Sequence, residues 1–283
     1  MKPTTRKRLG SIALNGTAIV VFLFAVFPVY WMVATAFKPN DEIFTTDFIL
    51  FPRQPTLEHV TQVFTDGVAG NSIWVYMGNS VFVALGTVLI GSVVALLAAT
   101  AVSRFRFKGR TPLMIVLLIM QMVPAEALLI SLFLMIRGAG LYGQLLGLVV
   151  VNVALTLPFG IWMLRTFVAA VPKELEEAAW IDGASRFRTF WKVLFPLVAP
   201  GLVATSIFSF ITAWNELIFA LTLMPESSGY TMPVALRFFF GQRGTDWGAI
   251  MASSTLMTIP VVLFFLMVQR RMVSGLVAGA VKG

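Results

Sequence analysis

Glutamates at two positions interrupt long apolar runs of this 283-residue sequence. Glu126 and Glu216 each lie well inside a predominantly apolar run of more than 20 residues. A carboxylate at membrane depth is costly, so both residues are candidates for a functional role. Trp214 and Asn215 directly precede Glu216, and an aromatic ring beside planar polar groups is suited to holding a hydroxyl-rich ligand. Glu126, Trp214, Asn215 and Glu216 therefore define a candidate substrate path.

The two carboxylates have other interpretations. At about 1.5 Å per residue, straight helices would carry Glu126 and Glu216 into the outer half of a membrane core about 30 Å thick. There they could pair with polar groups of a helix bundle, or lie in wet helix ends, without touching a ligand. A proton relay is a third interpretation, but it needs further acids or histidines along the spans. The single histidine, His59, lies in a polar stretch and is expected to be solvated.

Catalytic chemistry finds little support in the sequence. A membrane hydrolase needs a nucleophile with an adjacent base, and no apolar run contains a histidine or a cysteine. Because cysteine is absent, a disulfide framework and a thiolate metal site are both excluded. No G-x-x-x-x-G-K-[ST] sequence occurs, so the chain lacks that loop for cradling nucleotide phosphates. We therefore expect a chain that is not an enzyme and that binds no metal and no cofactor.

Composition predicts an all-α integral membrane protein. Hydrophobic residues make up 58% of the chain and charged residues 12%, whereas soluble domains carry about 25% charged residues. The apolar residues form runs of roughly 20 or more, unlike the ~10-residue alternation of barrel strands. Six transmembrane helices in a single domain account for the whole length. The predicted spans are residues 12–37, 79–102, 112–136, 145–167, 197–223 and 247–268.

Basic residues are divided unevenly between the links that join these spans. One side holds both termini, the 104–110 link and the 168–196 segment. With Arg165 at its inner edge counted, this side carries 16 of the 21 Lys and Arg residues. By the positive-inside rule this side is cytoplasmic, so the links 38–76 and 224–246 face outward from the cell membrane. The net charge of +8 is thus explained by membrane orientation rather than by nucleic-acid binding. The first apolar run is far longer than the ~7–15 residues of a signal-peptide core and is read as a retained span.

The segment 172–196 is a long charge-rich stretch between two predicted spans. Three glutamates load its beginning, Gly183 can take the left-handed conformation that ends a helix, and Ser185 can cap the next one. Apolar residues then recur at helical spacing as far as Pro196, which we expect to end the second helix. Such a helix-turn-helix could dock onto a protein partner or rest on lipid headgroups, and the pattern alone favours neither.

This segment resembles the EAA loop, E-A-A-x3-G-x9-I-x-L-P, of ABC-importer permeases. Val193 and Phe195 replace the Ile and Leu of that pattern with apolar residues of similar size. In that family the loop forms a coupling helix that fits a cleft on a cytoplasmic ATPase subunit. The resemblance implies the ABC type I importer permease fold, with six transmembrane helices and a cytoplasmic coupling segment. The residues to which it assigns ATPase coupling are Glu177, Ala178, Ala179, Asp182, Gly183 and Ala184.

From about Asn79 onward the chain is similar to the smaller permease of carbohydrate-type importers, the maltose-permease class. Residues 269–283 closely resemble the ending Q-R-x-x-V-x-G-L-x-x-G-x-V-K-G of this permease type. In the maltose system such a cytoplasmic tail reaches between two ATPase subunits. The tail residues to which the resemblance assigns ATPase contacts are Gly275, Gly279, Lys282 and Gly283.

The resemblance also implies partners. They are a second homologous permease, two ATPase subunits that hold ATP and Mg, and an extracytoplasmic solute-binding protein. The implied cargo is a sugar, in particular an oligosaccharide or a glycoside. Glycerol-3-phosphate or a related phosphodiester is the alternative cargo, and an ion-coupled secondary carrier is a further alternative. An anionic cargo would favour cationic side chains along the path, yet the only ones near the spans are the interfacial Arg137 and Arg165.

Overall fold

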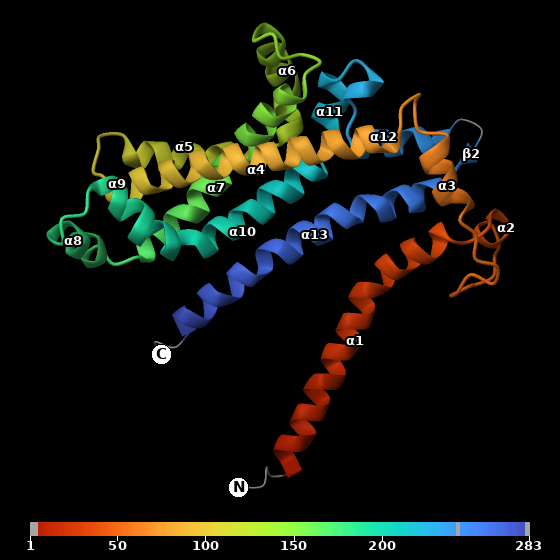
Figure 1. Ribbon diagram of the computed structural model, residues 1–283, viewed down its shortest axis with the longest axis horizontal. Coiled ribbons are helices and arrows are strands. Elements are labelled where there is room, and N and C mark those ends of the chain that lie inside the picture. Colours follow the sequence, from red (N-terminus) through yellow and green to blue (C-terminus); the bar gives the residue numbers. More distant parts are fainter. Residues whose placement is uncertain (1–4, 242–243, 281–283) are drawn as a thin grey trace. The chain divides into compact units, whose positions relative to one another are not determined.

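The computed structural model describes the backbone of residues 5–241 and 244–280, and the side chains of residues 11–241 and 244–269. The chain divides into two compact units. The first comprises Met1–Val68 and Leu236–Thr258, and the second comprises Ala69–Ala235 and Ile259–Gly283. Helices dominate both units, as the composition predicts (Figure 1).

The first unit contains the long helix α1 (Thr5–Ala36) and the beginning of α13 (Trp247–Ala280). Two short helices follow α1 in the segment expected to be a polar link. They are α2 (Asn40–Ile43) and α3 (Glu58–Thr65). A short antiparallel pair, β1 (Phe240–Gly241) and β2 (Gly244–Thr245), precedes α13.

His59 is buried, which corrects the expectation that it is solvated. Its exposed fraction is 1%, and its Nε2 lies 3.0 Å from the carbonyl oxygen of Lys38. The ring packs against Gly248, where a Cβ atom would collide with it. The amphipathic helix α3 turns His59 and Val63 inward, so α3 is attached to the beginning of α13 within this unit.

The second unit is a bundle in which α4, α7 and α10 pack against one another and α5 packs against α7 (Figure 1). Shorter helices join or flank these four. The helices are α4 (Ile73–Arg104), α5 (Arg110–Met122), α6 (Leu129–Gly138), α7 (Leu145–Ala170), α8 (Glu174–Ile181), α9 (Arg186–Thr189), α10 (Phe195–Trp214), α11 (Ile218–Leu223) and α12 (Met232–Leu236).

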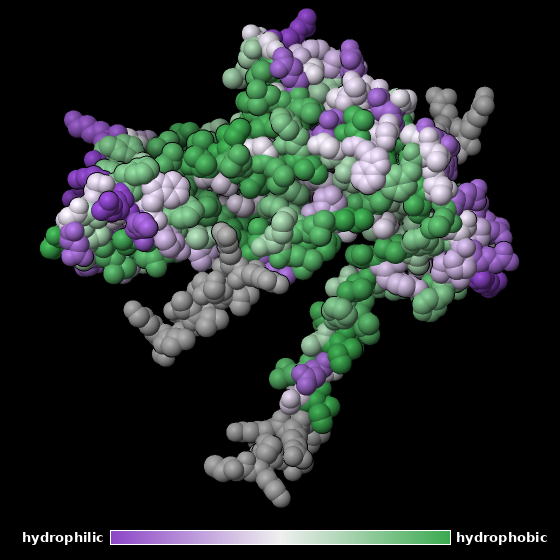
Figure 2. Space-filling view, in the orientation of Figure 1, coloured by the Kyte–Doolittle hydropathy of each residue, from purple (hydrophilic) through white to green (hydrophobic). Residues whose placement is uncertain are grey.

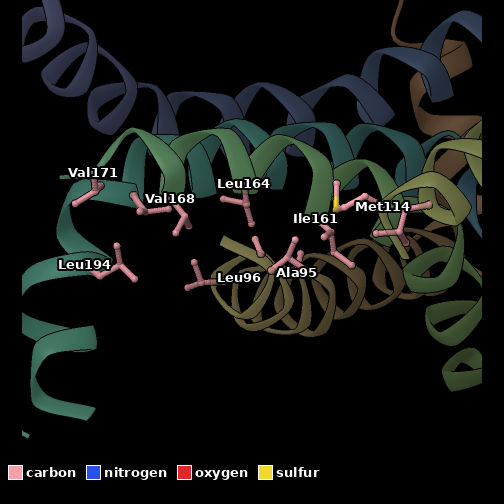
Figure 3. Packing of buried hydrophobic residues seen from close by; sticks show 12 residues of the cluster. Ala95, Leu96, Met114, Ile161, Leu164, Val168, Val171 and Leu194 are labelled. Atoms are coloured by element: carbon pink, nitrogen blue, oxygen red, sulfur yellow. The ribbon is translucent and has the colours of Figure 1, made fainter. Parts of the chain in front are cut away.

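Small and branched apolar side chains fill the core of this bundle. Figure 3 shows Ala95 and Leu96 of α4 lying opposite Ile161 and Leu164 of α7. A Cβ built on Gly160 would lie 3.2 Å from the Cβ of Ala95, so the two backbones approach closely there. Close packing of this kind holds helices together where surrounding lipid removes the usual hydrophobic driving force.

Five helical segments among the described residues are long and apolar enough to cross a membrane, and a bent helix pair makes up to six. The five are Ser11–Ala36, Ile73–Arg104, Leu145–Ala170, Arg186–Trp214 and Trp247–Gln269. The bent pair falls in the predicted span 112–136, where α5 and α6 meet at 101°. That range is therefore not one continuous helix.

Proline explains this break. Pro124 follows Val123, and a residue before proline is driven out of the α-helical region. Val123 accordingly has an extended backbone with ψ of 123°, and a short 3₁₀ turn, η1 (Ala125–Leu128), leads into α6.

The predicted span 197–223 differs from the structure at both ends. Pro196 does not end the helix, because a π-helical turn, η2 (Phe190–Leu194), precedes it. The Phe195 N–H bonds five residues back to Phe190, and this wider turn accommodates the proline ring. At the other end α10 stops at Trp214, and the chain resumes as the separate helix α11 after a break at residues 215–217.

Candidate functional site

The segment between α7 and α10 forms a compact elbow. Gly183 has φ of +82° and directly follows α8 and its C-cap. Its N–H bonds to the Trp180 carbonyl at 3.0 Å, and the Ala184 N–H bonds to the Ala179 carbonyl at 2.9 Å. This pair of bonds is a Schellman motif, which ends a helix and reverses the chain sharply. Ser185 then caps α9 by accepting a hydrogen bond from the Arg188 N–H at 3.3 Å, so the predicted helix-turn-helix is confirmed.

The residues assigned to coupling form the exposed surface of this elbow. Glu177, Ala178, Asp182 and Gly183 are exposed, and Ala179 and Ala184 are partly so. A Cβ on Gly183 would meet nothing within 4 Å, so the space beside it is open. We call these six residues together with Ile181 the elbow surface.

Two large apolar side chains stand out at the elbow. Ile181 is 87% exposed and Phe187 is 74% exposed. In Figure 2 hydrophilic residues gather at the α8 and α9 end of this unit, and apolar atoms are exposed among them. The sequence pattern did not predict the exposure of Ile181, although this residue directly precedes Asp182 and Gly183 at the expected helix end. An exposed apolar tip beside small residues suits insertion into a cleft.

An almost buried ion pair holds the elbow to the end of α4. The Nε of Arg104 lies 2.6 Å from Oε1 of Glu176, with side chains 10% and 11% exposed. The same guanidinium donates from Nη2 to the Val171 carbonyl at 2.9 Å. In the sequence, Arg104 is one of several basic residues in a link, and Glu176 is one of three acidic residues at a helix start. The pair spans 72 residues, and no local pattern indicates it.

A cavity of about 390 Å³ lies between the elbow and the end of α4. Its walls are largely apolar and include Trp180, Phe187 and Phe190, while Arg104 and Glu176 contribute polar groups. The cavity lets α8 stand off the bundle, so the ion pair is a principal fixed contact between α8 and α4.

Trp214 does not offer an open stacking platform, which corrects that part of the substrate-path prediction. The residue is 1% exposed, and its ring stacks on Phe210 with centroids 5.4 Å apart. Phe210 stacks in turn on Phe264 at 4.1 Å. The ring therefore packs against apolar neighbours, although its Nε1–H has no partner among the described residues.

Glu216 caps a helix. Its carboxylate accepts hydrogen bonds from the backbone N–H groups of Phe219 at 2.6 Å and Ala220 at 2.9 Å. These are N–H groups of the first turn of α11, which have no partner within the helix. Asn215 is exposed and donates to the Ile211 carbonyl at 2.9 Å. The arrangement favours the polar-packing interpretation of Glu216 over direct contact with a ligand.

Glu126 lies in the break between α5 and α6 and is exposed. Because both Glu126 and Glu216 sit at helix breaks, the depths calculated for straight helices do not apply to them. Among the described residues no hydrogen bond or ion pair joins the two carboxylates. The structure thus brings Trp214, Asn215 and Glu216 together at one break and leaves Glu126 at another.

The tail residues are only partly covered by the structure. Gly275 and Gly279 fall within the helical backbone of α13. Lys282 and Gly283 lie outside the described residues. Within the described part of the chain, no group of three or more His, Cys, Asp or Glu side chains could hold a metal ion.

Comparison with known proteins gives consistent matches over nearly the whole chain. Residues 88–277 match the family described as binding-protein-dependent transport system inner membrane component. The diacetylchitobiose uptake system permease protein DasC of Streptomyces coelicolor is 44% identical, with 98% of this chain and 99% of that protein covered. The trehalose/maltose transport system permease protein MalG of Thermococcus litoralis is 37% identical over 94% of this chain and 95% of its own length.

A solved structure shows the same fold. A chain of a bacterial ABC transporter involved in the import of the acidic polysaccharide alginate matches with a TM-score of 0.78. The match covers 95% of this chain and 99% of the other, at 20% sequence identity. The all-α membrane architecture expected from the sequence is therefore confirmed at the level of the fold.

Proposed function

Because this chain belongs to the binding-protein-dependent transport system inner membrane component family, we propose that it is the permease subunit of an ATP-driven sugar importer. The observation that carries the proposal is the exposed elbow between α7 and α10. Its Schellman turn at Gly183 presents small residues and the apolar tip of Ile181 to a partner. A membrane chain with such a rigid, exposed knob is suited to receive mechanical work from a separate ATPase.

The partners follow from this proposal. Two ATPase subunits hold ATP and Mg, and this chain holds no cofactor of its own. A second homologous permease completes the path, and an extracytoplasmic solute-binding protein delivers the cargo. The chain crosses the inner membrane several times with both termini in the cytoplasm, as the uneven distribution of Lys and Arg supports.

Transport proceeds by alternating access. Closure of the two ATPase subunits displaces the elbow surface and shifts the permease pair from an inward-open to an outward-open arrangement. The coupling residues are Glu177, Ala178, Ala179, Asp182, Gly183 and Ala184. The tail residues Gly275, Gly279, Lys282 and Gly283 contact the ATPase subunits.

The cargo is an oligosaccharide or a glycoside. Relatives named for diacetylchitobiose, for trehalose and maltose, and for sulfoquinovosyl glycerol support this class. Glu126, Asn215 and Glu216 remain the residues proposed for the path in this chain, whereas Trp214 is buried beside them. Glu216 acts there by holding the helix break in shape, because its carboxylate is committed to the start of α11.

The test is mild detergent purification of this chain from its native membrane, with mass spectrometric identification of what copurifies. We expect an ATPase and a second permease in stoichiometric amounts, and the reconstituted assembly should import a disaccharide only with ATP and the binding protein. Recovery of the chain alone, under conditions that keep a known importer intact, would favour a secondary carrier instead.

A further inference from the structure

We propose that Arg104 is a positioning residue for energy coupling, because its ion pair with Glu176 joins the elbow to α4 so that the two move together. The inference rests on the proposed importer function. It rests on three features. The Arg104–Glu176 ion pair, called the joint below, lies at one end of α4, hydrogen bonds to residues 228–232 lie at the other end, and α4 itself connects the two.

The joint has more than one attachment. Arg104 reaches the side chain of Glu176 on α8 at 2.6 Å and the backbone carbonyl of Val171 just before α8 at 2.9 Å. A planar guanidinium that uses two nitrogens fixes direction as well as distance. Since both charged side chains are about nine-tenths buried, water competes poorly for either partner.

Glu176 differs from its neighbour in the coupling motif. Glu177 is exposed on the elbow surface, where a partner can reach it, whereas Glu176 points back towards the bundle. Adjacent glutamates on one helix turn therefore serve opposite directions. One is available to the partner, and the other is committed to α4.

A single helix, α4, connects these two sets of contacts. α4 runs unbroken from Ile73 to Arg104, 32 residues or about 48 Å, and packs along both α7 and α10 (Figure 1). An unbroken helix inside a packed bundle transmits displacement along its length with little bending.

The far end of α4 holds a loop. The Asn79 side-chain amide donates to the carbonyls of Ser228 and Tyr230, both at 2.8 Å. The Ser80 hydroxyl accepts from the Met232 N–H at 2.8 Å. Residues 228–232 belong to the link expected to face the solute-binding protein, so α4 is attached at one end to the elbow and at the other to this link.

The consequence is a mechanical one. A displacement imposed on the elbow by the ATPase is carried through Arg104 to α4 and on to the 228–232 loop. Without the joint, α8 can shift into the cavity of about 390 Å³ beside it, and the displacement is absorbed there. The joint therefore determines how much of each ATP-driven displacement of the elbow is transmitted through α4 to residues 228–232.

The first experiment compares transport with ATP hydrolysis in the reconstituted full assembly, using diacetylchitobiose and trehalose as probes. Arg104→Ala should keep basal ATPase activity and lower the sugar imported per ATP by about tenfold, within the usual range of coupling energies. Glu176→Gln, which keeps an acceptor oxygen, should give a smaller loss. The combined exchange Arg104→Glu with Glu176→Arg should recover part of the transport. Arg106→Ala, which removes an exposed neighbouring charge, is the matched control and should behave as wild type.

The second experiment asks whether the two ends move as one body. The chain has no cysteine, so spin labels can be placed at Arg188→Cys on α9 and Ser228→Cys in the loop. In the otherwise wild-type chain the distance between labels should stay constant between the ATP-free and ATP-trapped states. In the Arg104→Ala background it should change when ATP is trapped, a result that a merely structural role of Arg104 would not produce.

The experiments distinguish failure of the proposed importer function from failure of the Arg104–Glu176 joint. If the wild-type assembly imports neither probe nor any other sugar with ATP, the proposed function fails and the joint fails with it. If the wild-type assembly imports sugar and Arg104→Ala imports as much per ATP, only the joint is overturned. An Arg104→Ala chain that no longer assembles leaves the decision to Glu176→Gln, whose wild-type coupling and constant label distance would overturn the proposal.

Discussion

The imidazole ring of His59 lies directly against the backbone of Gly248, so closely that no Cβ fits at that position. Gly248→Ala should therefore force the ring from its site and break its contact with the Lys38 carbonyl. We expect the free energy of unfolding to fall by about 1–3 kcal/mol, the usual cost of overpacking a filled core. A lower thermal unfolding midpoint of the purified chain would report this loss.

The control for this change is Gly78→Ala, also in a helix, where a new Cβ would meet nothing within 4 Å. It should leave the midpoint unchanged or slightly higher, because alanine favours the helix. Equal midpoints for the two variants would show that His59 does not depend on the space at Gly248.

Gly183→Asp should leave the chain inserted in the membrane and abolish sugar uptake. The aspartate places a charged side chain into the open space of the elbow surface and strains a backbone with φ of +82°. The strain alone costs about 1–2 kcal/mol. Membrane abundance by immunoblot and uptake of labelled sugar measure the two effects.

Gly140→Asp separates strain from docking. Gly140 has φ of +72° and open space around it, but it lies in the turn between α6 and α7, away from the elbow along the chain. This variant should suffer the same backbone strain and keep its uptake. Uptake by Gly183→Asp at the Gly140→Asp level would remove the elbow from the coupling mechanism.

Glu216→Ala should reduce transport while the assembly stays intact. The change removes the acceptor for the Phe219 and Ala220 N–H groups and destabilises the start of α11 by about 0.5–2 kcal/mol. Initial uptake rates at saturating and limiting sugar would report it. Glu216→Gln keeps an oxygen acceptor and should retain most of the activity, whereas equal losses in both variants would point to the charge itself.

Lys38 should make stability depend on alkaline pH. Burial lowers the pKa of its ammonium below the ordinary 10.5, while Glu42 opposes this shift more weakly. In the pH interval between the lowered value and 10.5 the unfolded chain binds more protons, so folding becomes more favourable as pH rises. The unfolding midpoint of wild type should therefore rise relative to that of Lys38→Met as the pH approaches 10.5. A difference between the two midpoints that stays constant with pH would contradict this account.

Local signals predicted much of the elbow. Gly183 as a left-handed helix end and Ser185 as a cap depend only on neighbouring residues, and the structure confirms both. The break at Pro124 carries an equally local signal, but the prediction of one continuous span over residues 112–136 did not use it. Pro196 shows the limit of such rules, because the π-helical turn that accommodates it has no residue signature of its own.

Long-range relationships could not be predicted from the sequence. Arg104 and Glu176 meet across 72 residues, and each also fits an ordinary role where it stands in the chain. The burial of Trp214 depends on stacking with Phe210, which in turn stacks on Phe264 of a helix much later in the chain. Composition predicts that such residues lie in a membrane, but only packing decides whether they face a path or a neighbour.

The π-helical turn at Phe190–Leu194 also sets an angular relationship. One extra residue in a helical turn rotates everything beyond it by about 100° about the axis. The aromatic face that precedes α10 is therefore out of phase with the face that α10 presents to α4 and α7. Deleting a single residue within this turn would restore a regular helix and re-aim the whole elbow by about a quarter of a revolution. The direction in which the knob points is thus encoded in the winding of the helix behind it, and not only in the residues that form the knob.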